Sequence, residues 1–332
     1  MNNILNGVVR CSLYTGTYGR KRCTAKCLGC FVGESETFNS EYQGNTSQVH
    51  ELMSVLPNLK EAVIMGNPDP SVDTEVCNET AKILQSKCIR VSFLTNGTGD
   101  MDIIRKIIDG LDLSLIYGFG FSVDSLDDDK NSILKGKNIS LKNTIYNMML
   151  LKDLGIYVVA FFAIWPTNMN DNWQEYTDYF ESRGIHVSSS FGSIASAQGR
   201  IKHVSEEEIL KIRGRYSDVR LATVLANDDE YQEYLSTYVT KNKLQCTSLK
   251  KINVYFTGGG LKASYSCPII SAVYPEYLVN IHDIDFHAFH DNTIKTGYCP
   301  VAKEAIGFKS AKLHPICRFH KFKPKKLHEY VT

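Results

Sequence analysis

Short apolar runs alternate with segments of helical periodicity through about the first two thirds of this 332-residue chain. The runs are four to seven residues long, as buried strands are, and turn-forming Gly, Pro or Asn residues follow several of them. We expect strands at 8–13, 62–65, 90–94, 117–123, 158–164 and 186–191. Six βα units in series predict a parallel α/β sheet joined by right-handed crossovers.

Two architectures fit this alternation, a closed or partly closed barrel and an open doubly wound sheet. In both, the loops after the carboxyl ends of the strands build the functional site. The sequence contains no GxxxxGK[ST] phosphate loop, and Gly118-Phe119-Gly120 lacks the third glycine of a dinucleotide loop. The functional residues are therefore sought elsewhere at the strand ends.

The composition describes a protein that can bury a substantial core. Hydrophobic residues make up 43% of the chain, and 37 Lys and Arg nearly balance 36 Asp and Glu. A formal charge of +1 gives no overall attraction to nucleic acid or to membranes. The longest apolar run, 158–165, is far shorter than the ~20 residues of a membrane-spanning helix. Because residues 1–7 also lack the pattern of a signal peptide, we expect a soluble, cytoplasmic protein.

The βα alternation ends near Asn227, where scattered Cys and His residues replace the helix-forming pattern. The sequence therefore predicts a boundary within 225–245. Residues 1–225 are expected to form the α/β domain, and residues 240–332 a smaller, irregular C-terminal extension.

Three of the ten cysteines form a CxxxCxxC motif in the loop after the first expected strand: Cys23, Cys27 and Cys30. Cytosolic thiols stay reduced, so grouped cysteines there favour metal or cluster binding over disulfides. Thiolates suit zinc and iron–sulfur clusters. Three close ligands without a fourth indicate a cluster with one iron open to an exogenous ligand. The alternatives are three unrelated cysteines or a zinc site completed by a distant residue, and the protein would then be a non-catalytic zinc or iron–sulfur binding protein.

With this motif in this loop, the sequence resembles the radical S-adenosylmethionine (SAM) enzymes over about residues 5–205. The resemblance implies a partial (β/α)6 TIM-like barrel with a [4Fe–4S] cluster held by Cys23, Cys27 and Cys30. It also implies reductive cleavage of SAM at this cluster, giving a 5′-deoxyadenosyl radical that abstracts hydrogen from a substrate. The cofactors then perform the difficult chemistry, and the protein orients them.

The resemblance extends to the ends of later strands. Family members receive SAM at a Gly-Gly-Glu-Pro-like turn after the second strand; residues 66–70 are a diverged version without the glutamate. An aromatic residue usually precedes the third cysteine, whereas this chain has Gly29 there and Phe31 just after the motif. The residues that the resemblance implies for SAM binding are Phe31, Gly66, Asn67, Pro68, Asn96, Ser122, Asp124 and Arg200.

The C-terminal extension contains four cysteines, and a cubane cluster takes four ligands. The cysteines are Cys246, Cys267, Cys299 and Cys317. Because many radical SAM enzymes carry C-terminal auxiliary clusters, these four are interpreted as ligands of a second [4Fe–4S] cluster. A zinc site and ordinary buried thiols are the alternatives. The remaining cysteines near predicted elements, Cys11, Cys77 and Cys88, are expected in the core.

In the enzymes that this chain resembles, such C-terminal cysteines serve peptide substrates or electron transfer. The resemblance therefore implies a peptide or protein substrate, modified by epimerisation, crosslinking or a similar reaction at a C–H bond. A basic and aromatic tail from Lys309 onward motivates the alternative of a nucleotide, RNA or small-metabolite substrate. The expected partners are the substrate and an electron donor such as a flavodoxin or ferredoxin, with no membrane.

Overall fold

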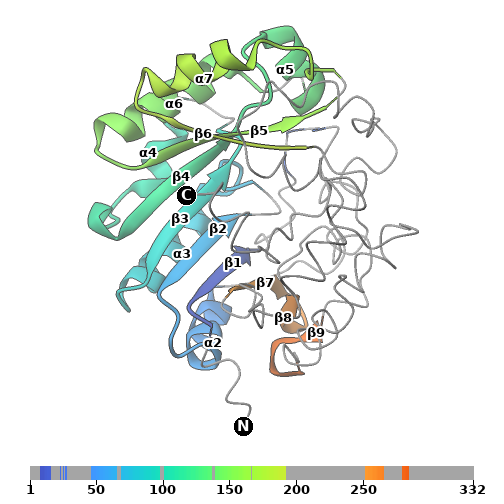
Figure 1. Ribbon diagram of the computed structural model, residues 1–332. Coiled ribbons are helices and arrows are strands. Elements are labelled where there is room, and N and C mark those ends of the chain that lie inside the picture. The colour runs from blue at the N-terminus through green and yellow to red at the C-terminus, as the bar shows by residue number, and fades with distance from the viewer. Residues whose placement is uncertain are drawn as a thin grey trace, which may run out of the picture.

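The computed structural model contains one mixed sheet of nine strands in the order β6-β5-β4-β3-β2-β1-β7-β8-β9, and this sheet is curved (Figure 1). The structure describes residues 8–15, 23, 25, 27, 46–65, 69–97, 101–136, 139–165, 167–191, 251–264 and 279–283.

Six strands are parallel, as the alternating pattern predicts, and they follow one another across the sheet in chain order. They are β1 (Arg10–Tyr14), β2 (Glu61–Met65), β3 (Arg90–Thr95), β4 (Ile116–Ser122), β5 (Val158–Ile164) and β6 (His186–Phe191). Because these strands are parallel, their carboxyl ends lie along one edge of the sheet. The loops after them therefore meet at that edge.

The helices between these strands lie along the outer, convex side of the sheet (Figure 1). They are α2 (Ser47–Val55), α3 (Thr74–Gln85), α4 (Ile103–Ile108), α5 (Asp128–Lys135), α6 (Leu141–Asp153) and α7 (Trp173–Glu181), with the 3-10 turn η2 (Leu113–Leu115) before β4. Helix α5 begins within the acidic stretch Asp127–Asp129, and the sequence pattern predicts no helix there.

One face of each central strand packs against these helices. In β5, Val158, Ala160, Phe162 and Ile164 are buried in the main core, whereas Phe161 between them is 37% exposed. Successive side chains of a strand point to opposite faces, so Phe161 belongs to the concave face. The helices therefore cover one face of β5, and Phe161 lies on the other face.

A strand from the C-terminal third completes the sheet beside β1. Strand β7 (Lys251–Thr257) pairs with β1 in parallel, and Arg10 lies opposite Lys251. The antiparallel strands β8 (Gly260–Ser264) and β9 (Val279–Asn280) follow, and the turn η7 (Ile281–Asp283) comes after them. Tyr14 and Tyr255, opposite each other in β1 and β7, stack with ring centroids 4.6 Å apart.

The expectation that Cys11, Cys77 and Cys88 lie in the core is correct for two of these residues and wrong for one. Cys11 and Cys77 are buried, but Cys88 is exposed. Cys88 has φ +57° and follows α3, where its backbone N–H bonds to Gln85 O at 2.8 Å. It therefore occupies the left-handed position that ends many helices, where backbone geometry decides the exposure.

Within the part of the chain described here, no helix combines the length and apolar character that crossing a membrane requires.

Candidate functional site

Two cysteines of the CxxxCxxC motif, Cys23 and Cys27, are described in the loop after β1, and both are half-buried. The third, Cys30, lies outside the described residues. The same holds for Phe31, Gly66, Asn67, Pro68, Arg200 and the C-terminal Cys246, Cys267, Cys299 and Cys317. Asn96, Ser122 and Asp124 are described, and all three lie at carboxyl ends of strands.

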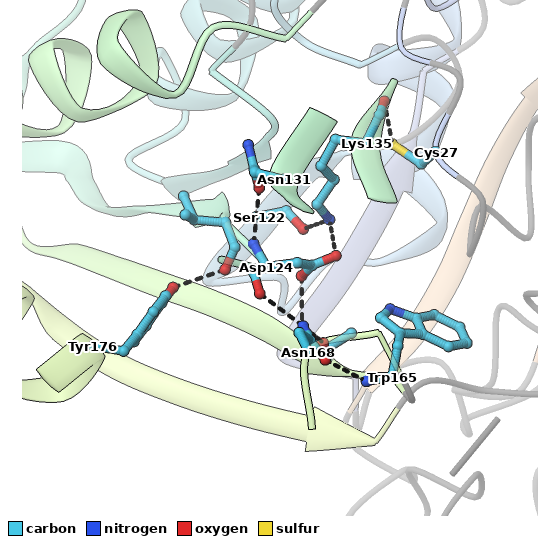
Figure 2. Close-up of polar contacts among 10 residues, drawn as sticks. Cys27, Ser122, Asp124, Asn131, Lys135, Trp165, Asn168 and Tyr176 are labelled. Carbon is cyan, nitrogen blue, oxygen red and sulfur yellow. Dashed lines mark hydrogen bonds and ion pairs between the residues drawn. The ribbon is translucent and has the colours of Figure 1, made fainter. Parts of the chain in front are cut away.

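The end of β4 contains a buried ion pair (Figure 2). The Lys135 ammonium lies 2.8 Å from Oδ2 of Asp124, and the two side chains are 8% and 3% exposed. The same ammonium donates a hydrogen bond to the hydroxyl of Ser122, the last residue of β4. A lysine, a carboxylate and a hydroxyl thus share one enclosed position at the end of the strand.

The remaining polar atoms of Asp124 are also engaged. Its Oδ1 accepts a hydrogen bond from the backbone N–H of Ala163 at 2.9 Å, and its own N–H donates to Oδ1 of Asn131 at 3.2 Å. Asn168, which is fully buried, donates from Nδ2 to the Asp124 carbonyl at 2.7 Å. Buried polar groups need such partners, because burying a donor or acceptor without a hydrogen bond costs the free energy of removing it from water. Asp124 is therefore held in one orientation.

A buried tyrosine forms a hydrogen bond to the backbone of the same turn. Tyr176 of α7 donates its hydroxyl proton to the carbonyl of Val123 at 2.7 Å. Burial, followed by the negative charge of Asp124, raises the pKa of Tyr176 well above its ordinary value. The hydroxyl consequently stays protonated and remains a donor over the whole physiological range.

Lys135 also reaches the cysteine loop through its backbone. Its carbonyl oxygen accepts a hydrogen bond from Sγ of Cys27 at 3.5 Å (Figure 2). Lys135 is the last residue of α5, and Gly136 ends the helix with φ +96°. One residue therefore connects the loop after β1 with the polar cluster at the end of β4.

Lys135 is the residue of this cluster that the sequence prediction missed. The signals that could have revealed it are Asp127, which caps α5 by accepting from the N–H of Lys130, and Gly136 directly after the lysine. Together they delimit a short helix whose final residue points back to the strand end.

Asn96 follows β3, and its backbone is fixed on two sides. Its N–H donates to Oδ2 of Asp69 at 2.7 Å, and its carbonyl accepts from the Thr144 hydroxyl at 3.1 Å. Asp69 lies in the turn after β2, and Thr144 is on α6. The turn after β3 is thereby connected to both neighbouring elements.

Comparison with known proteins identifies a domain and a fold. Residues 20–180 match the family model of the Radical SAM superfamily. None of the curated proteins matches the sequence.

Two solved enzymes illustrate the structural likeness. SuiB of Streptococcus suis, in a crystal structure with the precursor peptide SuiA, has a TM-score of 0.61 and 14% identity over 95% of this chain and 77% of that one. The structure of anSMEcpe with bound AdoMet has a TM-score of 0.55 and 13% identity, covering 97% of both chains. At these identities the likeness concerns the fold, a mixed α/β arrangement with a parallel sheet like the (β/α) barrels of these radical SAM enzymes. Residues 20–180 are thus a Radical SAM domain, the domain of a superfamily of enzymes.

Proposed function

We propose that this enzyme uses a [4Fe–4S] cluster and SAM to modify a peptide or protein at a C–H bond. The observation that carries the proposal is the connection of the cysteine loop, through the Cys27–Lys135 hydrogen bond, to the enclosed Ser122–Asp124–Lys135 cluster. The loop that carries the proposed cluster ligands is thus connected to polar groups that would suit the amino-acid end of SAM.

The thiols near β1 fit a cluster better than the thiol inside the helical layer does. Cys23 and Cys27 are half-buried rather than fully buried. Cys77, by contrast, is buried, and burial with the nearby Asp73 and Asp69 raises the pKa of its thiol. Since thiolates are the ligands of iron, Cys77 is a poor ligand. Cys23, Cys27 and Cys30 are accordingly the proposed cluster ligands.

When bound, the cluster and SAM supply one-electron cleavage of a sulfur–carbon bond and hence a hydrogen-abstracting radical. The role of the protein's own residues is to bind and orient the cluster and SAM. The Lys135 ammonium offers positive charge for the SAM carboxylate, and Asp124 holds that ammonium against Ser122. Asn96, which follows the neighbouring strand β3, is also a proposed SAM contact. Phe31, Gly66, Asn67, Pro68 and Arg200 remain proposed SAM contacts from the sequence.

The proposal of a peptide substrate rests on two supports. The four C-terminal cysteines suit an auxiliary cluster, and the similarly folded SuiB was crystallised with its precursor peptide. The division into residues 1–225 and 240–332, a flavodoxin or ferredoxin as electron donor and a cytoplasmic location belong to the same proposal.

Anaerobic reconstitution tests the cofactor part. Wild-type protein should bind about four irons if it holds one cluster and about eight if it holds two. Cys23→Ser should abolish 5′-deoxyadenosine formation from SAM under reducing conditions. Cys88→Ser is the matched control, because Cys88 is an exposed thiol outside the motif, and it should retain full iron and activity. Bound zinc without iron, or wild-type protein that cleaves no SAM, would contradict the proposal.

The substrate part needs its own measurement. Short peptides encoded beside the gene are incubated with reduced enzyme and SAM, and each peptide is then analysed by mass spectrometry. The expected result is faster 5′-deoxyadenosine formation together with a changed mass or stereochemistry in one peptide. Stimulation by a nucleoside or RNA pool instead, with every peptide unchanged, would replace the peptide substrate by the nucleotide alternative.

A further inference from the structure

The turn after β2 contains a carboxylate that faces the neighbouring strand. Asp69 is 7% exposed. Its Oδ1 accepts hydrogen bonds from the N–H of Ser71 at 2.9 Å, from the Ser71 hydroxyl at 2.7 Å and from the hydroxyl of Thr95. Its Oδ2 accepts from the N–H of Asn96 at 2.7 Å. Both carboxylate oxygens are thus hydrogen-bonded. Oδ1 bonds to Ser71 in the same turn and to Thr95 at the end of β3, and Oδ2 bonds to Asn96 just after β3.

The connection continues along β3. Thr95 is the last residue of that strand, is 2% exposed and gives its hydroxyl proton to Asp69. The same hydroxyl oxygen accepts a hydrogen bond from the N–H of Gly97 at 3.0 Å. A chain of bonds therefore runs from Asp69 through Thr95 to Gly97.

Helix α6 holds the turn after β3 from the other side. The Thr144 hydroxyl donates to the Asn96 carbonyl, and Asn147 Nδ2 donates to the Gly97 carbonyl at 3.4 Å. Gly97 has φ +65°, and a Cβ built there would lie 2.7 Å from a ring carbon of Phe121. The conformation of this turn is thus fixed by its surroundings, with Asp69 as the anchor on the side of β2.

We propose that Asp69 is a positioning residue that fastens the turn after β3 to the segment after β2, and so holds Asn96 in place for SAM binding. This inference rests on the proposed function, in which Asn96 binds SAM. A carboxylate with both oxygens engaged in this way is not the group that contacts the ligand. It acts through the backbone that it holds, because preorganised groups bind without an ordering cost.

Two substitutions remove the connection at different points. Asp69→Asn keeps an oxygen for Ser71 and Thr95 but turns an N–H₂ group toward the donating N–H of Asn96. Thr95→Val keeps the size of the side chain and the Asp69 carboxylate, and removes only the hydroxyl that joins them. If Asp69 contacted SAM directly, Thr95→Val, which keeps the carboxylate, should change SAM binding much less than Asp69→Asn does.

The chain also offers a matched control. Asp112, the first residue of the Asp-Leu-Ser sequence that precedes β4, accepts hydrogen bonds from the N–H of Ser114 at 2.9 Å and from its hydroxyl at 2.6 Å. This repeats the local bonding of Asp69 with Ser71, but at the opposite edge of the sheet. Asp112→Asn should therefore leave SAM binding unchanged.

Two readouts are compared in reconstituted protein. With SAM, Asp69→Asn and Thr95→Val should each raise the KM for SAM about tenfold while kcat changes less than about twofold. Without SAM, hydrogen–deuterium exchange at the amides of Ser71, Asn96 and Gly97 should become faster in both variants and not in Asp112→Asn. Unchanged iron content in each variant shows that the cluster is intact.

The outcomes separate this inference from the proposed function. Faster exchange with a raised KM in both variants supports positioning. A raised KM only in Asp69→Asn, with unchanged exchange at Asn96, assigns Asp69 as a direct SAM contact and overturns it. Wild-type KM and exchange in both variants overturn it as well. Wild-type protein that binds no SAM would instead overturn the proposed function.

Discussion

Asp124 and Lys135 form an ion pair, 2.8 Å between Oδ2 and Nζ, in which both side chains are almost completely shielded from solvent. Asp124 follows β4, and Lys135 ends the helix α5 that comes next in the chain. A pair of this kind is stable only when both partners are present, because either charge alone would be buried without compensation. The helix and the strand end therefore depend on each other.

Substitution of Lys135 should destabilise the protein strongly. Lys135→Met leaves the Asp124 carboxylate buried without its ammonium, for which we expect a loss of about 3 kcal/mol in the free energy of unfolding, measured in urea. Lys130→Met is the control, since Lys130 pairs with Asp171 at a more exposed position and should cost much less. Equal losses of unfolding free energy in the two variants would show that burial of the Asp124–Lys135 pair does not increase the cost of removing the lysine.

Two glycines with left-handed backbones allow strain and crowding to be separated. Gly155 has φ +76°, and a Cβ added there would meet no atom within 4 Å, so Gly155→Ala should cost only the backbone strain, about 1 kcal/mol. Gly97→Ala adds the collision with Phe121 and should lower the melting temperature further. It should also weaken SAM binding, measured by equilibrium dialysis, whereas Gly155→Ala should not. The reverse order of stabilities would be inconsistent with the packing around Gly97.

The thiols should differ in reactivity. Burial, with Asp73 and Asp69 adding negative charge nearby, raises the pKa of Cys77, so this thiol stays protonated in the folded protein. At about pH 8, iodoacetamide should modify the exposed Cys88 and leave Cys77 intact until urea unfolds the protein. Peptide mapping after alkylation measures both sites. Modification of Cys77 at the rate of Cys88 in folded protein would contradict the buried position.

Tyr176 should contribute to the alkaline limit of stability. Its pKa is raised in the folded state, so above the ordinary tyrosine pKa of about 10 the unfolded chain loses a proton that the folded chain keeps. The contribution is complete below that pH and is lost as the pH rises toward the folded value. Tyr176→Phe should lower stability at neutral pH by about 1 kcal/mol through the lost bond to Val123 and flatten the alkaline decline. Urea titrations between neutral and alkaline pH measure both effects.

The parts that the sequence predicts well are those with strong local patterns. The apolar run 158–164 coincides with β5, and Gly155 ends the preceding helical segment with a positive φ. Helix α5 was missed because few of its residues face the core, and its buried residues include the polar Asn131 and Lys135. Polar residues give no apolar periodicity. With the helix, the lysine at its end was missed too.

Contacts between segments that are distant in the sequence could not be predicted, because local patterns do not specify which segment a strand or side chain will contact. The run 254–256 is recognisable as apolar, but nothing near it specifies β1 as its partner. Similarly, Asp69 in the diverged turn gives no sign that its carboxylate faces Thr95 and Asn96. The residue types at the strand ends could be predicted, whereas their mutual contacts required the fold.

The pairing of β1 with β7 also has a consequence for biosynthesis. The first strand leaves the ribosome early, yet Lys251, its counterpart across from Arg10, is translated only in the last quarter of the chain. Until then, one edge of β1 lacks this neighbour, and bare strand edges invite aggregation of nascent chains. Chaperone dependence of expression, and insolubility of fragments that stop short of residue 251, would follow from this late closure.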